Sequence, residues 1–198
     1  SPHEGGTSSF QLSYVGESCI ETSNTSVNDY CPVGHYCPAG SSAPTPCPPG
    51  TNSSAQGLYA VEACQLCTQG YYCPIPGTFL AEFVCPEGFY CPAGTNVTDD
   101  LACPAGNYCP EGSPAPIECA AGFYQDEFGQ SSCKVCPAGY YCQQNTADPV
   151  ECPAGSYCPD GTRFGTEFHC PVGTYSTTPG LPAVSNCTAC APGYYCEP

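Results

Sequence analysis

Hydrophobic and polar residues alternate only over short stretches of this chain, and glycine or proline repeatedly interrupts the pattern. A typical segment places one or two aromatic residues directly after a glycine, as in Gly70-Tyr71-Tyr72, and continues with a polar, proline-rich run such as 41–46. Because the 24 prolines and 22 glycines recur along the whole chain, no long helix can form. The pattern therefore predicts short β-hairpins and irregular turns, with almost no helix.

The first 18 residues differ from the rest of the chain. Phe10, Leu12 and Tyr14 alternate with polar residues, which predicts a strand with one apolar face. No partner strand follows at hairpin distance. This segment is therefore either an edge strand that caps the first repeat or an assembly arm that adds to the sheet of a neighbouring subunit. The pattern leaves both interpretations open.

A seven-residue phrase recurs along the remaining chain: Cys, usually Pro, any residue, Gly, any residue, Tyr, Cys. Its seven full copies are CPVGHYC at 31–37, CTQGYYC at 67–73, CPEGFYC at 85–91, CPAGNYC at 103–109, CPAGYYC at 136–142, CPAGSYC at 152–158 and CAPGYYC at 190–196. Three longer units begin in the same way at Cys47, Cys119 and Cys170 but lack the second cysteine, and each runs on to a later C-x-x-C pair. Successive units start 16 to 20 residues apart.

This repetition predicts two regions, an N-terminal arm at 1–18 with a degenerate repeat start and a tandem cysteine-rich array over 19–198. We number the ten units by their first cysteines, which are Cys31, Cys47, Cys67, Cys85, Cys103, Cys119, Cys136, Cys152, Cys170 and Cys190. In each phrase, Pro-x-Gly predicts a tight turn because glycine tolerates a positive φ. The tyrosine position is filled in nine of the ten units, and Asn52 holds it in the tenth. Packing and stacking between units is the favoured interpretation of these tyrosines, ahead of a carbohydrate-binding platform.

The 21 cysteines favour an oxidising, extracellular compartment, because cytosolic thiols are kept reduced. Met and Trp are absent and Leu and Ile are scarce, so a single large hydrophobic core is not expected. Disulfides, with a few buried aromatic residues in each unit, would replace that core. The expected fold class is a small disulfide-rich protein built as an elongated array of short β-hairpin and irregular units.

The unit pattern narrows the disulfide connectivity. In a local scheme, the first cysteine of each long unit pairs with the last cysteine of that unit, and the remaining pairs close within the phrases. The pairs are Cys47–Cys64, Cys119–Cys133, Cys170–Cys187, Cys31–Cys37, Cys67–Cys73, Cys85–Cys91, Cys103–Cys109, Cys136–Cys142, Cys152–Cys158 and Cys190–Cys196. We prefer this scheme to one that pairs Cys73 with Cys85, since the latter forces tight C-x-x-C bridges such as Cys64–Cys67. Interlocked pairing between adjacent units stays open.

Cys19 is left over from these ten pairs. Residues 13–19 look like a degenerate phrase in which Ser13 replaces the first cysteine and Gly16 keeps its place. Cys19 is therefore expected either to be unpaired or to bridge to another chain, and the rarity of free thiols in secreted proteins favours an intermolecular or rearranged bridge.

The formal net charge is −16, and Lys134 and Arg163 are the only basic residues besides three histidines. Nucleic acid is therefore excluded as a partner, because binding it needs a basic surface. The same charge disfavours docking on an anionic membrane, and no apolar stretch is long enough to span a bilayer, so direct membrane insertion is not expected.

No catalytic or metal-binding motif is found in the sequence. The C-x-x-C pairs lie about fifty or more residues apart, whereas a structural zinc site needs four converging ligands. His3, His35 and His169 share no spacing with an acid or a nucleophile, so no enzymatic activity is expected. No cofactor is predicted, although Asp99-Asp100 and Asp126-Glu127 could bind calcium weakly; solvated turns are the favoured interpretation.

Four N-glycosylation sequons occur, at Asn24, Asn52, Asn96 and Asn186. Covalent glycans are therefore expected on this chain. Since Asn52 replaces the tyrosine of its unit, that position is expected to be exposed.

The long units, in which C-P-x-G-x-Y runs on to C-x-x-C, resemble the ephrin-receptor-like cysteine-rich module and, more distantly, the first module of tumour-necrosis-factor-receptor repeats. The resemblance covers about residues 31–198 and rests on the spacing of Cys, Gly, Pro and Tyr. It implies an elongated module at a cell surface or in a matrix, and it implies no enzyme. The short C-P-x-G-x-Y-C units depart from both families and look like tandem runs in large extracellular proteins of protists and algae.

Two functions follow from these observations. The first is an extracellular structural protein, a glycosylated rod-like protomer that assembles with copies of itself into a fibre, appendage or matrix. The second is a receptor or adhesin ectodomain that binds an extracellular protein or glycan ligand. The repeats, the N-terminal segment and Cys19 favour the first.

Overall fold

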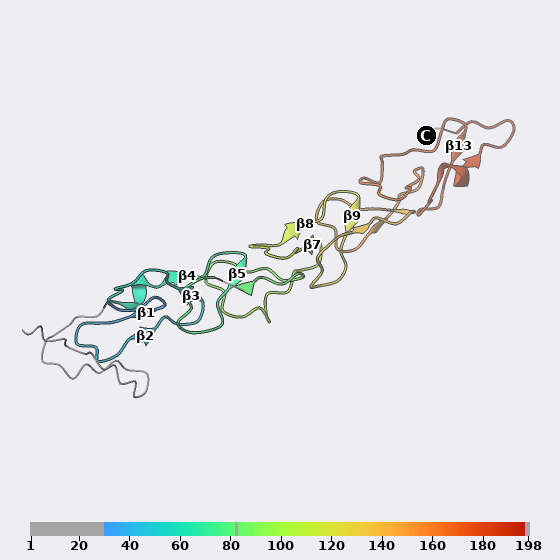
Figure 1. Ribbon diagram of the computed structural model, residues 1–198. Helices are drawn as coiled ribbons and strands as arrows, with labels where there is room; N and C mark the ends of the chain where they lie inside the picture. The colour runs from blue at the N-terminus through green and yellow to red at the C-terminus, as the bar shows by residue number, and fades with distance from the viewer. Residues whose placement is uncertain (1–29, 82, 197–198) are drawn as a thin grey trace, which may run out of the picture.

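The computed structural model describes residues 30–81 and 83–196, which form an elongated rod (Figure 1). The ten units follow one another from the β1 end to the β13 end of this rod. Ten disulfides, short antiparallel hairpins and the lack of any α-helix among these residues confirm the predicted small disulfide-rich fold.

All strands of the described chain are two residues long and pair with the next strand in sequence, giving seven two-stranded antiparallel sheets. The strands are β1 (His35–Tyr36), β2 (Thr45–Pro46), β3 (Thr51–Asn52), β4 (Gln65–Leu66), β5 (Tyr71–Tyr72), β6 (Phe83–Val84), β7 (Asn107–Tyr108), β8 (Ile117–Glu118), β9 (Phe123–Tyr124), β10 (Lys134–Val135), β11 (Tyr140–Tyr141), β12 (Val150–Glu151), β13 (Thr174–Tyr175) and β14 (Thr188–Ala189). Two short 3-10 helices, η1 (Val61–Ala63) and η2 (Val184–Asn186), lie in long units 2 and 9.

One register applies to every hairpin. The two residues after the phrase glycine pair with the two residues before the first cysteine of the next unit, as in Tyr71↔Val84 and Tyr72↔Phe83. In units 4 and 8 only one of the two residue pairs of this pattern forms, as an isolated antiparallel β-bridge. These pairs are Phe89↔Ala102 and Ser156↔His169. Each hairpin is therefore closed where the next unit begins.

The turn that starts each phrase explains why glycine occupies its fourth position. In unit 4 the amide of Phe89 donates to the carbonyl of Pro86 at 3.2 Å, and Gly88 between them has a φ of +80°. Residues with a β-carbon are strained in this left-handed conformation, whereas glycine is not. The chain then leaves the turn in an extended conformation and enters the hairpin.

The apolar interior of the rod consists almost entirely of disulfides. Fifteen cysteines and Leu181 are the buried hydrophobic residues of the described chain. The expectation of buried aromatic residues in each unit is wrong, because the phrase tyrosines are half-buried or exposed. Only two aromatic pairs lie in contact among the described residues, Tyr72–Phe83 and Tyr157–Phe168, and both are formed within a unit rather than between units.

The structure pairs the twenty described cysteines in ten bridges with Cα–Cα distances of 5.8–6.1 Å. The three long units are closed by Cys47–Cys64, Cys119–Cys133 and Cys170–Cys187, and every short unit is closed within its phrase. These are the pairs of the local scheme. Every described disulfide therefore lies within one unit, and the units are joined by other means.

Backbone hydrogen bonds join successive units. Between units 3 and 4, the amide of Cys85 donates to the carbonyl of Gly70 at 2.9 Å, and the amide of Gly70 donates to the carbonyl of Cys91 at 2.8 Å. The other two bonds of this junction are Cys73 N–H to Thr95 O at 2.9 Å and Gly94 N–H to Cys67 O at 2.9 Å. The same four bonds recur at each of the seven junctions from units 1 and 2 to units 7 and 8.

Units 1 to 9 each contain a second turn, and in units 2 to 9 this turn supplies one donor of the junction with the preceding unit. Its third residue has a positive φ and follows the first cysteine of the unit by nine or ten residues; we call it the second-turn residue. The second-turn residues are Gly40, Gly57, Gly77, Gly94, Gly112, Gly129, Asn145, Gly161 and Gly180. From Gly57 onward, each amide donates to the first cysteine of the preceding unit.

The second turns also reach one unit further back. A β-carbon on Gly70 in unit 3 would lie 2.6 Å from the carbonyl oxygen of Gly112 in unit 5, which is closer than real β-carbons approach. The same approach occurs at the phrase glycine of each of units 1 to 7. In each case the carbonyl oxygen belongs to the second-turn residue two units further along the chain, and all seven glycines are buried. Each of units 1 to 9 thus contacts its neighbour and its next neighbour, which explains why the array is a rod rather than a flexible string of beads.

Candidate functional site

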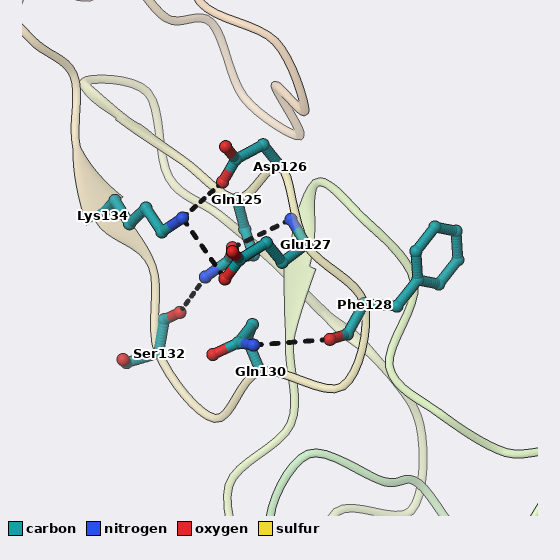
Figure 2. A network of polar contacts seen from close by, with 7 residues as sticks. All are labelled: Gln125, Asp126, Glu127, Phe128, Gln130, Ser132 and Lys134. Atoms are coloured by element: carbon teal, nitrogen blue, oxygen red, sulfur yellow. Dashed lines mark hydrogen bonds and ion pairs between the residues drawn. The ribbon is translucent and has the colours of Figure 1, made fainter.

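The loop of long unit 6, residues 124–134, has the densest polar network of the described side chains (Figure 2). Gln125 stands where a short unit has its second cysteine, and it is 1 % exposed. Its Nε2 donates to the carbonyl of Ser132 at 2.7 Å, and its Oε1 accepts from the amide of Glu127 at 3.1 Å. One buried amide therefore ties together both sides of the loop.

An ion pair closes the same loop from outside. Lys134 Nζ lies 2.6 Å from Asp126 and 3.4 Å from Glu127, and it also lies 5.9 Å from the centre of the Tyr124 ring. The hydrogen bond that Lys134 donates to Asp126 lowers the pKa of Asp126 and raises the pKa of Lys134. Because these groups are exposed to solvent, the pair contributes mainly to the order of the loop.

The network presents Phe128 at the tip of the loop. Gln130 Nε2 donates to the carbonyl of Phe128 at 3.4 Å, and the ring points away from the network (Figure 2). The side chain is 69 % exposed. An aromatic residue on a pre-ordered loop suits protein recognition, because little side-chain and loop entropy is lost on binding.

Replacing Gln125 by alanine is expected to loosen this loop. The substitution leaves the Ser132 carbonyl and the Glu127 amide without their side-chain partner, and each lost hydrogen bond contributes about 0.5–1.5 kcal/mol net. Hydrogen exchange at the Glu127 amide should accelerate by roughly tenfold or more. Gln130→Ala is the matched control, since it removes a single longer bond at the surface. Equal exchange rates in the two variants would contradict the assigned role of Gln125.

The two acidic pairs proposed for weak calcium binding lie in different surroundings. Asp126 and Glu127 contact Lys134, whereas Asp99 and Asp100 lie exposed in a turn. No three His, Cys, Asp or Glu side chains are brought together as metal ligands within 30–81 and 83–196. Arg163 pairs with Glu167 at 2.6 Å, so both basic residues of the chain are engaged in ion pairs.

His169 contacts Ser156 in the structure, a contact that the spacing of the two residues in the sequence did not indicate. Ser156 Oγ lies 3.2 Å from His169 Nδ1, because the hairpin register pairs these two positions. An activated nucleophile needs a base that is itself oriented by a third group. His169 makes no hydrogen bond to a carboxylate within the described part of the chain. The pair lines a pocket near the β13 end of the rod.

The predicted glycosylation sites occupy different local structures. Asn96 and Asn186 are exposed, the latter within η2. Asn52 is half-buried in β3 opposite Gln65, so the expectation that this position is exposed is wrong. Asn24, Cys19 and the arm residues Phe10, Leu12 and Tyr14 lie outside the described residues.

A protein-family model matches part of this chain. The family is described as tyrosine-protein kinase ephrin type A/B receptor-like. Residues 106–150 match it. A comparison with curated proteins finds no match. The matched segment begins in the phrase of unit 5, includes all of unit 6 with its Phe128 loop, and ends before unit 8.

The match confirms the resemblance to the ephrin-receptor-like cysteine-rich module for this segment. With the dense disulfides, it indicates an extracellular, cysteine-rich, receptor-like module. Among the described residues, no helix has the length and apolar character needed to cross a bilayer.

Proposed function

We propose that this chain is an extracellular structural protein, a rod-like protomer that assembles with copies of itself into a fibre, appendage or matrix. The observation that carries this proposal is the repeated backbone ladder between successive units. Because amides, carbonyls and disulfides hold the shape, the side chains on the outside are free to vary. Such an array suits a spacer or building block better than an enzyme, so the proposed role is non-catalytic.

Covalent glycans belong to the same proposal. Asn96 and Asn186 are exposed, as N-glycosylation requires. Asn96 lies close to the turn that precedes Asn52, since the β-carbon of Asn96 lies 3.5 Å from where one on Gly50 would stand.

A receptor or adhesin ectodomain is the second candidate function. Phe128 supports it, because this exposed aromatic side chain sits on an ordered loop inside the segment matched by the receptor-like family. A protein ligand with an apolar pocket would suit that loop.

Electron microscopy and sedimentation of the oxidised, glycosylated chain distinguish the two functions. The structural role predicts regular filaments that persist on dilution. A monodisperse monomer under oxidising conditions would contradict it. Loss of ligand binding in Phe128→Ala, with Phe164→Ala as a control at another exposed aromatic residue, would favour the ectodomain role.

A further inference from the structure

Threonine hydroxyls commonly close turns in this rod, and Thr45 is an exception. Thr51, Thr95 and Thr162 each donate the hydroxyl to the carbonyl of the proline three residues earlier, at 2.6–2.7 Å. The Thr45 side chain is exposed, and its hydroxyl has no hydrogen-bond partner among residues 30–81 and 83–196. This hydroxyl is therefore free to react.

The exposure of Thr45 comes from its place in the repeat and not from the position of unit 1 in the rod. Thr45 pairs with the phrase tyrosine Tyr36, and Ile117 and Val150, each also preceded by a proline, pair with the phrase tyrosines of units 5 and 7. Those two units have described neighbours on both sides, yet Ile117 is 42 % exposed and Val150 is 48 % exposed. The strands β2, β8 and β12, which contain these three residues, are exposed at both of their positions. An exposed side chain at this place is thus a property of the hairpin, with units packed on either side.

Prolines on both sides of Thr45 hold its backbone extended. Pro46 restricts Thr45 to extended conformations, and Pro44 has a fixed φ. An enzyme that modifies a hydroxyl must bind the acceptor backbone in one conformation, and a segment that is already extended loses little entropy on binding. Serine and threonine mixed with proline, as in 41–46, are also the composition of O-glycosylated extracellular segments.

The other exposed threonines whose hydroxyls have no hydrogen-bond partner in the described chain lack this setting. None of them has a proline as a direct neighbour. Two follow a bridged cysteine directly, and the other two lie in a turn and a bend. In that order, these threonines are Thr68, Thr188, Thr166 and Thr177.

The chain around Thr45 contains no acidic residue. The nearest ones in the sequence are Asp29 and Glu62, although the whole chain has 18. Carboxylates close to an acceptor repel the anionic diphosphate of an activated sugar. The segment around Thr45 therefore suits such a co-reactant better than most of this acidic chain does.

We propose that Thr45 is an O-glycosylation site, an inference that rests on the extracellular location in the proposed function. The co-reactant is a nucleoside-diphosphate sugar, brought by a separate transferase. Thr45 Oγ1 forms a bond to the anomeric carbon of the sugar as the bond from that carbon to the diphosphate breaks, and the hydroxyl proton leaves with the nucleoside diphosphate. The transfer needs no oxidant or reductant. The site is distinct from the asparagine sequons, where the acceptor is an amide nitrogen.

Transfer to the folded, oxidised full chain tests the site directly. The probe is uridine-diphosphate N-acetylgalactosamine with a polypeptide N-acetylgalactosaminyltransferase, and intact mass with peptide mapping is the measurement. One sugar is expected at Thr45, and Thr45→Val should lose it without unfolding, since the hydroxyl makes no described hydrogen bond. Thr68→Val is the matched control, because it removes another exposed hydroxyl without a described partner and should leave the transfer unchanged. Transfer to Thr45 only after reduction of the disulfides would overturn the proposal, because the folded hairpin would then hide the acceptor.

The chain secreted from cultured animal cells provides the second test. After enzymatic removal of asparagine-linked glycans, the peptide that contains Thr45 should keep extra mass, and alkaline β-elimination should release that mass as a sugar. Thr45→Val should lack it, whereas sugar retained on Ser41 or Ser42 in this variant at the wild-type level would contradict the assignment to Thr45. An unmodified Thr45 in a chain that still forms filaments would overturn the glycosylation site and leave the structural function standing. A glycosylated chain that stays monomeric would do the reverse.

Discussion

Gly70→Ala is expected to open the rod around units 3 to 5, whereas Gly173→Ala is expected to leave it folded. Both glycines have a φ near +80°, so both variants carry the same left-handed strain of about 1–2 kcal/mol. Only at Gly70 does the new methyl group meet a backbone oxygen, that of Gly112, and overpacking of this kind costs typically about 1–3 kcal/mol more. The oxygen belongs to a backbone held by hydrogen bonds, so it cannot move aside freely.

Hydrogen exchange measured amide by amide is the decisive measurement for this pair. In Gly70→Ala, the amides of Cys85, Gly94 and Gly112 should exchange faster by roughly tenfold or more, because they take part in the two adjoining junctions. In Gly173→Ala the same amides should be unchanged. Equal exchange in both variants would show that the close approach of the second turn is not a real constraint on the rod.

Removing the Cys103–Cys109 bridge by a double substitution to alanine should destabilise the middle of the array. The bridge closes a short loop, and the chain-entropy estimate for such a loop is about 2 kcal/mol. Both sulfurs are fully buried in an interior with few other apolar groups, so packing is lost as well. Limited proteolysis under oxidising conditions should therefore cut within units 5 and 6 first.

The Cys190–Cys196 bridge provides the control for this experiment. It closes a loop of the same length, but unit 10 is joined to unit 9 by a single described hydrogen bond, from Cys190 to Gly173. Its removal should free the end of the rod and leave the cleavage pattern of the middle units unchanged. Equal protease sensitivity of units 5 and 6 in both variants would contradict a local role for Cys103–Cys109.

Features within a unit could be predicted from the sequence, because spacing reports them directly. The Pro-x-Gly turn, the hairpin that follows it and the short loops closed by cysteine all depend on residues a few positions apart. The half-buried state of Asn52 and of the tyrosines could not be predicted this way, since exposure depends on what the neighbouring units place over each position.

Contacts between units were the features that spacing could not reveal. The approach of Gly112 to Gly70 involves units that are not adjacent, so no short motif contains it. The Ser156–His169 contact lies within unit 8, but it follows from the hairpin register, which is known only once one hairpin is seen. Gln125 could have been found from the alignment of the repeats, because the long units have Ser53, Gln125 and Ser176 where the short units have a cysteine.

The separation between bridges within units and hydrogen bonds between units has a mechanical consequence. Tension applied to the two ends of the rod acts on the hydrogen-bonded junctions, since no described disulfide crosses from one unit to the next. The junctions can open in succession and re-form when the load is removed, while each covalent loop limits how much chain is released. The molecule would then lengthen under load in small reversible steps, while its disulfides stay intact.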